Sequence, residues 1–452
     1  MELNGRNRVL VLVGILFTVT MAGIDNTVVS TVMPVAIGEL GSPQLYAWSF
    51  AAYILATAVT MPIWGPGSDR WGRKRTFVAG LLVFLVGSAL CALAPTMPFF
   101  IAARALQGIG AGATSSLPFI ILGVVFPPEK RGKALGVVSS AWAIASVAGP
   151  LLGTAIVTTT SWRWAFLVNL PVGAVALFLI LRFMPESIGE RAGRFDLAGS
   201  LLAGLGGSAL IWAFVDMGEG AFGALEFGLI AAGISMLAAF VWHEGRAARP
   251  ILPLSFFKHR GYAMAMAASF LGFFSAFGVS ALLPLRANAV FHGAAAVGLV
   301  VGAFTIGWSG GALVTGRLIH RLGERRPALL GLALHAVGLV LLVFAFAGGV
   351  PFVMAAGAIA GLGMGIASPG MTVTVQNSVE VRQMGSATTS QQFLRQLGAA
   401  LGIGSFLLAS SLHGLEAAMI LGVVFTLAAL AFAFGLPHSS LRAHAAPTGD
   451  AL

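Results

Sequence analysis

The chain has 452 residues, of which 58% are hydrophobic and 9% are charged, and its mean hydropathy is +0.92. Apolar runs of about 20 residues extend from the first residues almost to the end, which excludes a soluble enzyme and a soluble domain with a single membrane anchor. The sequence therefore predicts an all-α integral membrane protein. Helices satisfy their backbone hydrogen bonds within lipid, and the runs are too long and too apolar for barrel strands.

The apolar runs and their polar interruptions predict fourteen transmembrane helices. In chain order, the predicted helices cover residues 9–34, 45–66, 77–95, 98–125, 133–157, 164–184, 197–215, 222–242, 261–283, 294–316, 327–347, 350–376, 385–411 and 415–436. Several of them contain glycine or proline, which membrane-spanning helices tolerate. We interpret the first run as a span rather than a signal peptide, because it is too long and has no small-residue cleavage site.

Basic residues between the predicted helices indicate the orientation of the chain. The net charge is +10, and positively charged loops remain on the cytoplasmic side of a membrane. With a cytoplasmic N-terminus, all of the 26 lysines and arginines lie in cytoplasmic segments except Arg104, Arg163, Arg286 and Arg395. We therefore expect a plasma-membrane protein with both termini in the cytoplasm. We assign the basic surface to topology and lipid headgroups rather than to nucleic acid.

Three pairs of matching segments indicate an internal duplication. Similar sequences begin at Gly65 and Gly316, at Gly108 and Gly361, and at Gly132 and Gly385, always with a shift of about 252 residues. The duplication predicts an N-terminal six-helix bundle at 1–190, an inserted two-helix segment at 191–260, a pseudo-symmetric C-terminal six-helix bundle at 261–436 and a disordered cytoplasmic tail at 437–452. Duplicated halves with a site between them are typical of transporters.

Five motifs resemble the signatures of one transporter family. They are Ile24-Asp25-Asn26-Thr27-Val28-Val29 with Pro34, Gly65-x-x-x-Asp69-Arg70-Trp71-Gly72-Arg73-Lys74, Arg104-Ala-Leu-Gln107-Gly108-Ile-Gly110, Gly149-Pro150-Leu-Leu-Gly153 and Trp162-Arg163-Trp164-Ala165-Phe166-Leu167-Val168-Asn169. On these motifs the chain resembles the major facilitator superfamily and, within it, the fourteen-span drug:proton antiporter family, over nearly its full length. Four positions depart from the family pattern: Ser30 replaces Asn, Ala145 and Thr154 replace Gly, and His320 replaces an acidic residue.

The resemblance implies roles for the loop motif and for the fifth predicted helix. A cytoplasmic gate would be formed by Gly65, Asp69, Arg70, Gly72, Arg73 and Lys74, with a salt-bridge latch that holds the inside closed. A hinge would be formed by Gly149, Pro150 and Gly153, because the proline removes a backbone donor and bends the helix. The alternatives are topogenic charge for the loop and an ordinary kink for the helix.

Asp25 and Arg104 are the clearest ionisable residues inside predicted helices, where a charge costs several kcal/mol. They lie roughly 13 Å and 9 Å below the outer ends of their helices at 1.5 Å per residue, so their side chains can meet. We expect Asp25 to titrate or to receive a cationic substrate, with Arg104 tuning that titration. The alternative is a static buried ion pair that holds two helices together. The resemblance implies that both helices line the cavity, which favours the first interpretation.

Polar residues in three predicted helices complete the expected substrate cavity. Its predicted lining comprises Asp25, Asn26, Gln107, Gln391, Gln392 and Arg395. For Arg395, the alternative is a snorkelling or helix-packing role. We interpret Arg286 as interfacial and His335 as a packed, hydrogen-bonded residue of the interior.

The chain carries no motif typical of catalysis, ATP binding or a metal site. We therefore expect no enzymatic activity, no cofactor and no metal, with the proton gradient as the energy source. The sequence predicts a monomeric, proton-coupled exporter of drug-like or small amphiphilic molecules that works by alternating access, with protons and the lipid bilayer as its other partners. One alternative is an exporter of lipids or hydrophobic metabolites on the same fold, and another is a membrane sensor that does not transport.

Overall fold

The computed structural model describes residues 4–126, 128–186, 196–218, 220–248, 250–380 and 383–437. Every regular element in this part of the chain is a helix. Eleven of these helices are long and apolar enough to cross a membrane. The prediction of an all-α membrane protein is confirmed at this level. The predicted connection at 187–195 and the tail beyond residue 437 lie outside the described residues.

The first part of the chain contains α1 (Gly5–Leu40), η1 (Pro43–Leu45), α2 (Tyr46–Trp71), α3 (Arg73–Ala92), α4 (Met97–Val125), α5 (Pro128–Thr159), α6 (Trp164–Leu167) and α7 (Asn169–Phe183). The predicted helix 164–184 is therefore divided into α6 and α7 at Val168. Pro171 explains this break, because it has no N–H to donate to the carbonyl of Leu167.

The remaining part contains α8 (Leu197–Gly218), α9 (Ala224–Glu244), η2 (Leu254–Lys258), α10 (Arg260–Phe291), α11 (Ala294–Leu322), α12 (Arg325–Ala345), η3 (Phe346–Gly348), α13 (Val350–Asn377) and α14 (Met384–Phe434). Two predicted helices fall within α14, and the chain leaves the helical conformation between them at Gly414, where φ is +82°. Glycine adopts a positive φ without a steric penalty. A Cβ at Gly422 would lie 3.2 Å from the Phe406 ring, so the stretches before and after Gly414 pack side by side.

Alternate glycines let α4 and α13 each pack tightly between two neighbouring helices. A Cβ at Gly108 would overlap the carbonyl of Tyr53 in α2, and a Cβ at Gly110 would overlap the backbone of α3. At the matching repeat positions, a Cβ at Gly361 would overlap the backbone of α11 and a Cβ at Gly363 that of α12. Only hydrogen fits at these positions, so the helices approach to backbone contact, as is common in membranes.

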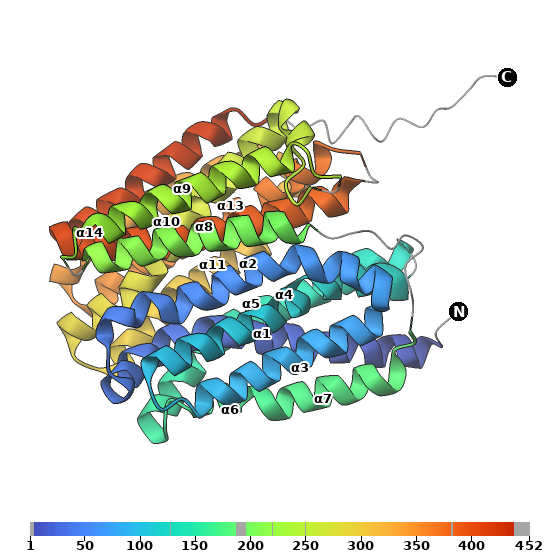
Figure 1. Cartoon of the computed structure of the whole chain (residues 1–452), viewed down its shortest axis with the longest axis horizontal. Coiled ribbons are helices and arrows are strands. Elements are labelled where there is room, and N and C mark those ends of the chain that lie inside the picture. The colour runs from blue at the N-terminus through green and yellow to red at the C-terminus, as the bar shows by residue number, and fades with distance from the viewer. Residues whose placement is uncertain are drawn as a thin grey trace.

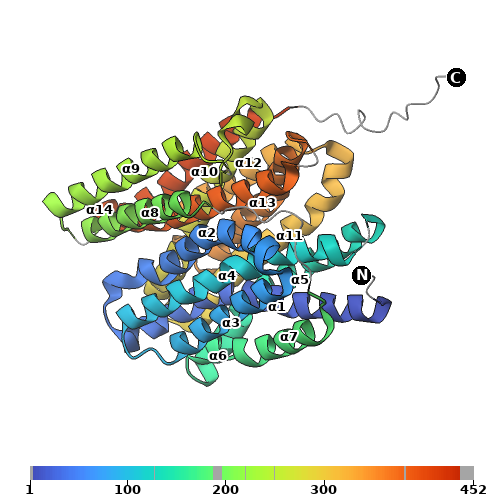
Figure 2. The ribbon, with the colours of Figure 1, turned by 45° about the vertical axis from the view of Figure 1, so that its right-hand side comes forward.

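The helices of the inserted segment lie beside α14 and α2 (Figures 1 and 2). Gly207 of α8 contacts both neighbours, because a Cβ there would lie 3.1 Å from Leu55 of α2 and 3.3 Å from Leu397 of α14. The next helix, α9, packs on α8 and brings Phe240 to 5.6 Å from the Phe393 ring of α14. The insertion therefore bridges helices from the beginning and the end of the chain.

Helices α1 to α7 pack on one another, as do α10 to α14, and the contacts of α5 with α11 and of α2 with α14 join the two groups. In Figure 1 the first group runs from blue (α1) to green (α7) and lies below the yellow to red second group. The chain enters α1 and leaves α14 at the same end of the bundle, on the right of Figure 1. Large apolar side chains such as Phe178 (62% exposed) and Phe344 (72%) cover outer faces, which suits contact with lipid.

Candidate functional site

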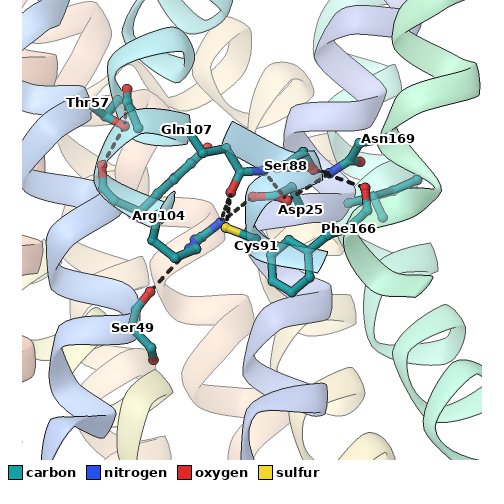
Figure 3. A network of polar contacts seen from close by, with 12 residues as sticks. Asp25, Ser49, Thr57, Ser88, Cys91, Arg104, Gln107, Phe166 and Asn169 are labelled. Carbon is teal, nitrogen blue, oxygen red and sulfur yellow. Dashed lines mark hydrogen bonds and ion pairs between the residues drawn. The ribbon is translucent and has the colours of Figure 1, made fainter. Parts of the chain in front are cut away.

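Asp25 and Arg104 meet in the interior of the N-terminal helices. Asp25 lies on α1 and Arg104 on α4, and neither side chain is more than 2% exposed. The Oδ2 atom of Asp25 is 2.9 Å from Nη1 of Arg104, which makes a charge-assisted hydrogen bond (Figure 3). The structure thus brings together the two residues that the sequence predicts as the proton-coupling pair.

Two amide side chains complete the hydrogen bonding of the Asp25 carboxylate. Gln107, one helical turn after Arg104 on α4, donates from Nε2 to Oδ1 over 2.8 Å. Asn169, the first residue of α7, donates from Nδ2 to the same oxygen over 2.9 Å. Both oxygens of this buried carboxylate therefore have partners, as a polar group without exposed surface requires.

Arg104 is held in place by groups other than Asp25. Its Nη1 donates to Oε1 of Gln107 over 2.6 Å, and its Nε donates to the carbonyl oxygen of Ser49 in α2 over 3.2 Å. The guanidinium carbon also lies 4.1 Å from the centroid of the Tyr53 ring, in a cation–π arrangement. Arg104 therefore has contacts with α2 and α4 that do not involve Asp25.

Ser88 and Asn169 are members of this network that the sequence interpretation missed. The hydroxyl of Ser88 in α3 accepts hydrogen bonds from Asn169 over 2.9 Å and from Gln107 over 3.2 Å, and it donates to the carbonyl of Phe166 over 3.0 Å (Figure 3). An amide inside an apolar run was an available signal for Asn169. Ser88 gave no signal, because serine in a membrane helix commonly bonds to its own backbone.

The predicted hinge residues of α5 pack against α1 close to Asp25. A Cβ at Gly149 would overlap the hydroxyl of Thr27, and a Cβ at Gly153 would lie 3.0 Å from Thr31. Pro150 lies between them inside α5. A bend at this point of α5 would therefore change its contact with the part of α1 that carries Asp25.

The predicted gate residues lie where α2 ends and α3 begins, and they are Gly65, Asp69, Arg70, Gly72, Arg73 and Lys74. Gly72 separates the helices with a φ of +97°, a value that favours glycine. Lys74 donates from Nζ to the carbonyl oxygen of Leu181 in α7 over 2.7 Å, and Arg70 is exposed. The side chain of Asp69 lies outside the described part of the structure, so the salt-bridge latch stays a prediction.

Glu186, which the sequence interpretation missed, caps the beginning of α3. Its carboxylate accepts hydrogen bonds from the backbone N–H groups of Lys74 over 3.1 Å and Arg75 over 3.2 Å. Negative charge is favourable at a helix N-terminus. A Cβ at Gly72 would overlap this carboxylate, so the glycine makes room for the cap. The segment after α7 is thereby tied to the predicted gate.

We expect Glu186→Ala to lower the free energy of unfolding by about 1 kcal/mol, because it removes the helix cap. Glu186→Gln should cost less, since one amide oxygen still accepts a backbone N–H. Thermal unfolding in detergent measures both effects. Glu416→Ala, which removes an exposed acid from α14, is the matched control. Equal unfolding temperatures for the two alanine variants would contradict the capping role.

The polar residues predicted in the C-terminal helices contact α10 and α13 from α14. Gln391 is buried and donates from Nε2 to the hydroxyl of Ser269 in α10 over 2.8 Å. Arg395 instead donates to Thr372 of α13 over 2.8 Å and to Gln392 over 3.2 Å. Within the described residues, no hydrogen bond joins these groups to the Asp25 network. On α1, Asn26 is half-buried beside Asp25.

The structure shows His335 packed and hydrogen-bonded, as the sequence predicts, and the interfacial position of Arg286 stays a prediction. His335 of α12 is fully buried, with Nδ1 2.8 Å from the carbonyl oxygen of Ala360 in α13. Arg286 is exposed, and its guanidinium lies 5.7 Å from the centroid of the Phe346 ring. No group of three or more His, Cys, Asp or Glu residues in the described part of the chain is placed to hold a metal ion.

Residues 15–403 match the family model of the Major Facilitator Superfamily. The chain belongs to the major facilitator superfamily. This member of the superfamily is 34% identical over 413 residues to Multidrug resistance protein 3 of Bacillus subtilis (strain 168), and the match covers 88% of this chain and 78% of that protein. It is 30% identical over 406 residues to Multidrug transporter protein MdtP of the same organism, covering 88% and 74% of the two chains.

A solved structure of the superfamily has the same fold. The crystal structure of the human organic anion transporter MFSD10 (TETRAN) is similar with a TM-score of 0.66 and 16% sequence identity, over 94% of this chain and 99% of that one. This likeness shows the fold alone. The family model and the relatives confirm the predicted superfamily, and the chain is a multi-pass membrane transporter rather than an enzyme.

Proposed function

We propose that this major facilitator exports drug-like or small amphiphilic molecules in exchange for protons, by alternating access. Its relatives named for multidrug resistance and multidrug transport match most of this chain and most of their own length. The proton gradient across the plasma membrane supplies the energy, and no cofactor takes part.

The proposed architecture has fourteen spans, arranged as two six-helix halves at 1–190 and 261–436 with the two inserted helices of 191–260 between them. Three features support this count. The helices α6 and α7 follow each other as one span, and Gly414 divides α14 into two spans. The long helices α2 and α5 add two spans to the eleven helices that are apolar enough to cross a membrane. The glycines of α4 and α13 support the duplication, because they pack in the same way at matching positions. An even number of spans puts both termini on the same side of the membrane, in agreement with the ends of α1 and α14 in Figure 1, and the basic loops favour the cytoplasmic side.

The observation that carries the proposal is the buried ion pair of Asp25 and Arg104. A carboxylate inside a membrane bundle is costly and is a functional candidate by default. The pair joins α1 to α4, so binding of a proton to Asp25 replaces an ionic attraction between these helices with a weaker neutral contact. Arg104 keeps its contacts with Ser49, Gln107 and Tyr53, and α1 is the helix that becomes free to shift.

In the proposed cycle, Asp25 becomes accessible alternately from the two sides of the membrane. Asp25 has no exposed surface, so α1 moves or turns before a proton or a substrate reaches it. The contact of Gly149 with Thr27 places the α5 hinge beside this part of α1. Substrate binding from the cytoplasm is coupled to proton release from Asp25, and reprotonation from outside drives substrate release.

The remaining predicted residues take supporting roles in this cycle. The gate residues between α2 and α3 hold the cytoplasmic side closed, supported by the contacts of Lys74 and Glu186 with the end of α7. Asn26 and Gln107 contribute to the cavity from the N-terminal half. Gln391, Gln392 and Arg395 contribute from the C-terminal half.

Purified protein in lipid vesicles tests this function. With an imposed pH gradient, we expect uphill movement of a fluorescent cationic amphiphile together with proton movement in the opposite direction, and a protonophore should abolish both. A fluorescent phospholipid in the same vesicles tests the alternative of lipid export on the same fold. Movement of the lipid without the amphiphile would favour that alternative. Movement of neither compound, without any proton flux, would contradict both and leave a non-transporting sensor.

A further inference from the structure

Arg395 of α14 is a buried positive charge in the interior of the C-terminal helices. Its side chain is 6% exposed. Nη2 donates to the carbonyl oxygen of Ser368 over 2.9 Å and to the hydroxyl of Thr372 over 2.8 Å, both in α13. The guanidinium carbon lies 4.7 Å from the centroid of the Phe273 ring in α10. All of these contacts are with neutral groups.

No acidic side chain among the described residues balances this charge. The ion pairs found in that part of the chain do not include Arg395. From residue 245 onward, the acidic residues are Glu324, Glu380, Glu416 and Asp450, of which the first three lie at helix ends or at the α14 break and the last lies outside the described residues. The buried Asp25 is already paired with Arg104. Among the described residues, Arg395 is therefore a buried cation without an acidic partner.

The hydrogen bonding of Arg395 is also incomplete. Its Nε is buried without a hydrogen-bond partner, and its Nη1 reaches only Oε1 of Gln392 at 3.2 Å. A buried, unpaired charge is costly in a membrane bundle, and such residues mark substrate pathways. An ionised oxygen in the place of the amide oxygen would form a shorter, charge-assisted hydrogen bond. Gln392 thus occupies a position that suits an anion.

The ring of Phe273, which contacts this guanidinium, belongs to a group of half-buried aromatic rings. Phe273 stacks on Phe277 with 5.8 Å between ring centroids, and both rings pack edge-on against Trp308 of α11, at 5.8 Å and 6.2 Å. These three rings and Gln392 keep part of their surface exposed. A few polar groups set among aromatic side chains are typical of small-molecule sites. The combination suits an amphiphile whose apolar part lies next to an anionic group.

We propose that Arg395 binds a carboxylate or phosphate group of the exported amphiphile, while Phe273, Phe277 and Trp308 contact its apolar part. This inference rests on the proposed export function and adds to its substrate class amphiphiles that carry an anionic group, zwitterions included. Such a substrate supplies the counter-ion that Arg395 lacks among the described residues.

A carboxylated rhodamine dye and its methyl ester test the proposal, because they differ only in the anionic group. Fluorescence polarisation measures their equilibrium binding to the purified protein without a pH gradient, so a failure of proton-driven export does not affect the result. We expect the wild-type protein to bind the acid more tightly than the ester. Arg395→Gln should weaken binding of the acid by about tenfold or more and binding of the ester by less than about twofold.

Gln392→Glu separates a ligand-binding role from a structural role without removing Arg395. The new carboxylate would replace an oxygen that lies 3.2 Å from Nη1 and would neutralise the guanidinium internally. We therefore expect a folded protein whose binding of the acid falls as in Arg395→Gln. Arg395→Lys should keep part of the preference for the acid, because it keeps the charge. Arg286→Gln, which removes an exposed arginine from α10, is the matched control and should bind both dyes as the wild type does.

Two results would overturn the proposal. One is a wild-type protein with no preference for the acid. The other is equal weakening of acid and ester in Arg395→Gln together with unchanged acid binding in Gln392→Glu, since that pattern describes a structural tie between α13 and α14. The same assay in nanodiscs with and without phosphatidylglycerol distinguishes the sources of the anion. Competition by this lipid that requires Arg395 would identify a lipid headgroup as a second carrier of the same anionic group and would support the site.

Discussion

Asp25→Asn should abolish proton-driven export, because asparagine neither binds nor releases a proton. The substitution keeps the shape of the side chain but leaves Arg104 buried without its charged partner. Removing one member of a buried ion pair costs about 3–5 kcal/mol, so we also expect a lower thermal stability. In either orientation the new amide nitrogen would face native donors, either the guanidinium of Arg104 or the amides of Gln107 and Asn169, and this adds to the cost.

Vesicles with an imposed pH gradient measure the effect of Asp25→Asn on proton-coupled transport. Glu39→Gln is the matched control, because Glu39 is also a carboxylate of α1 paired with an arginine, Arg163, but its side chain is 50% exposed. An exposed pair contributes about 0–1 kcal/mol, so this control should transport and unfold nearly as the wild type does. Full proton-driven transport by Asp25→Asn would rule out Asp25 as the coupling residue.

The double variant Asp25→Asn with Arg104→Gln distinguishes proton coupling from a static ion pair. Both charges are then absent, so the penalty of an unpaired buried charge disappears and part of the stability returns. If the pair only holds α1 against α4, transport should recover along with stability. We expect stability to recover while proton-driven export stays absent, because the site of protonation is gone.

Gly361→Ala should destabilise the protein by about 3 kcal/mol or more, because its Cβ would overlap the carbonyl of Phe304 and push α13 away from α11. Inserting a methyl group into a packed interior typically costs about 1–3 kcal/mol, and backbone atoms move less readily than a side chain. The clash outweighs the gain in helix propensity, which is about 1 kcal/mol for alanine over glycine.

Gly357→Ala tests this reasoning on the same helix, one turn away. The nearest atoms to a Cβ at Gly357 lie 3.9 Å away, which is an ordinary contact. We therefore expect this variant to unfold at or slightly above the wild-type temperature, in thermal unfolding measured in the same detergent. Similar unfolding temperatures for the two alanine variants would show that α11 and α13 separate without a large cost.

Hydropathy located the helices well because each apolar run is a property of its own segment. Even the break at Gly414 lies between two separately predicted helices, although the structure records one element there. The division at Val168 was missed, since the effect of Pro171 on the carbonyl of Leu167 depends on where the helix begins. The contact of α8 with both α2 and α14 could not be predicted from the sequence either, because it depends on which helix faces pack together in the folded protein.

The candidate site was predicted in part. Asp25 and Arg104 stood out because a charge in an apolar run is rare, and their depths allowed them to meet. Ser88 and Glu186 were missed, because short polar side chains and loop acids are ordinary features of such a sequence, and Asn169 was missed although an amide in an apolar run is a signal. They acquire a role only through the hydrogen bonds that they make across helices.

The sequence alone determined the class of protein, the helices, the distribution of charge and the two residues of the central ion pair. Each of these follows from local composition, since the cost of placing a group in lipid depends on that group. The tertiary structure decided which donors surround Asp25, how closely α4 and α13 approach their neighbours, and that Arg395 has no acidic partner among the described residues. These features depend on distances between side chains far apart in the chain, and those distances are set by packing.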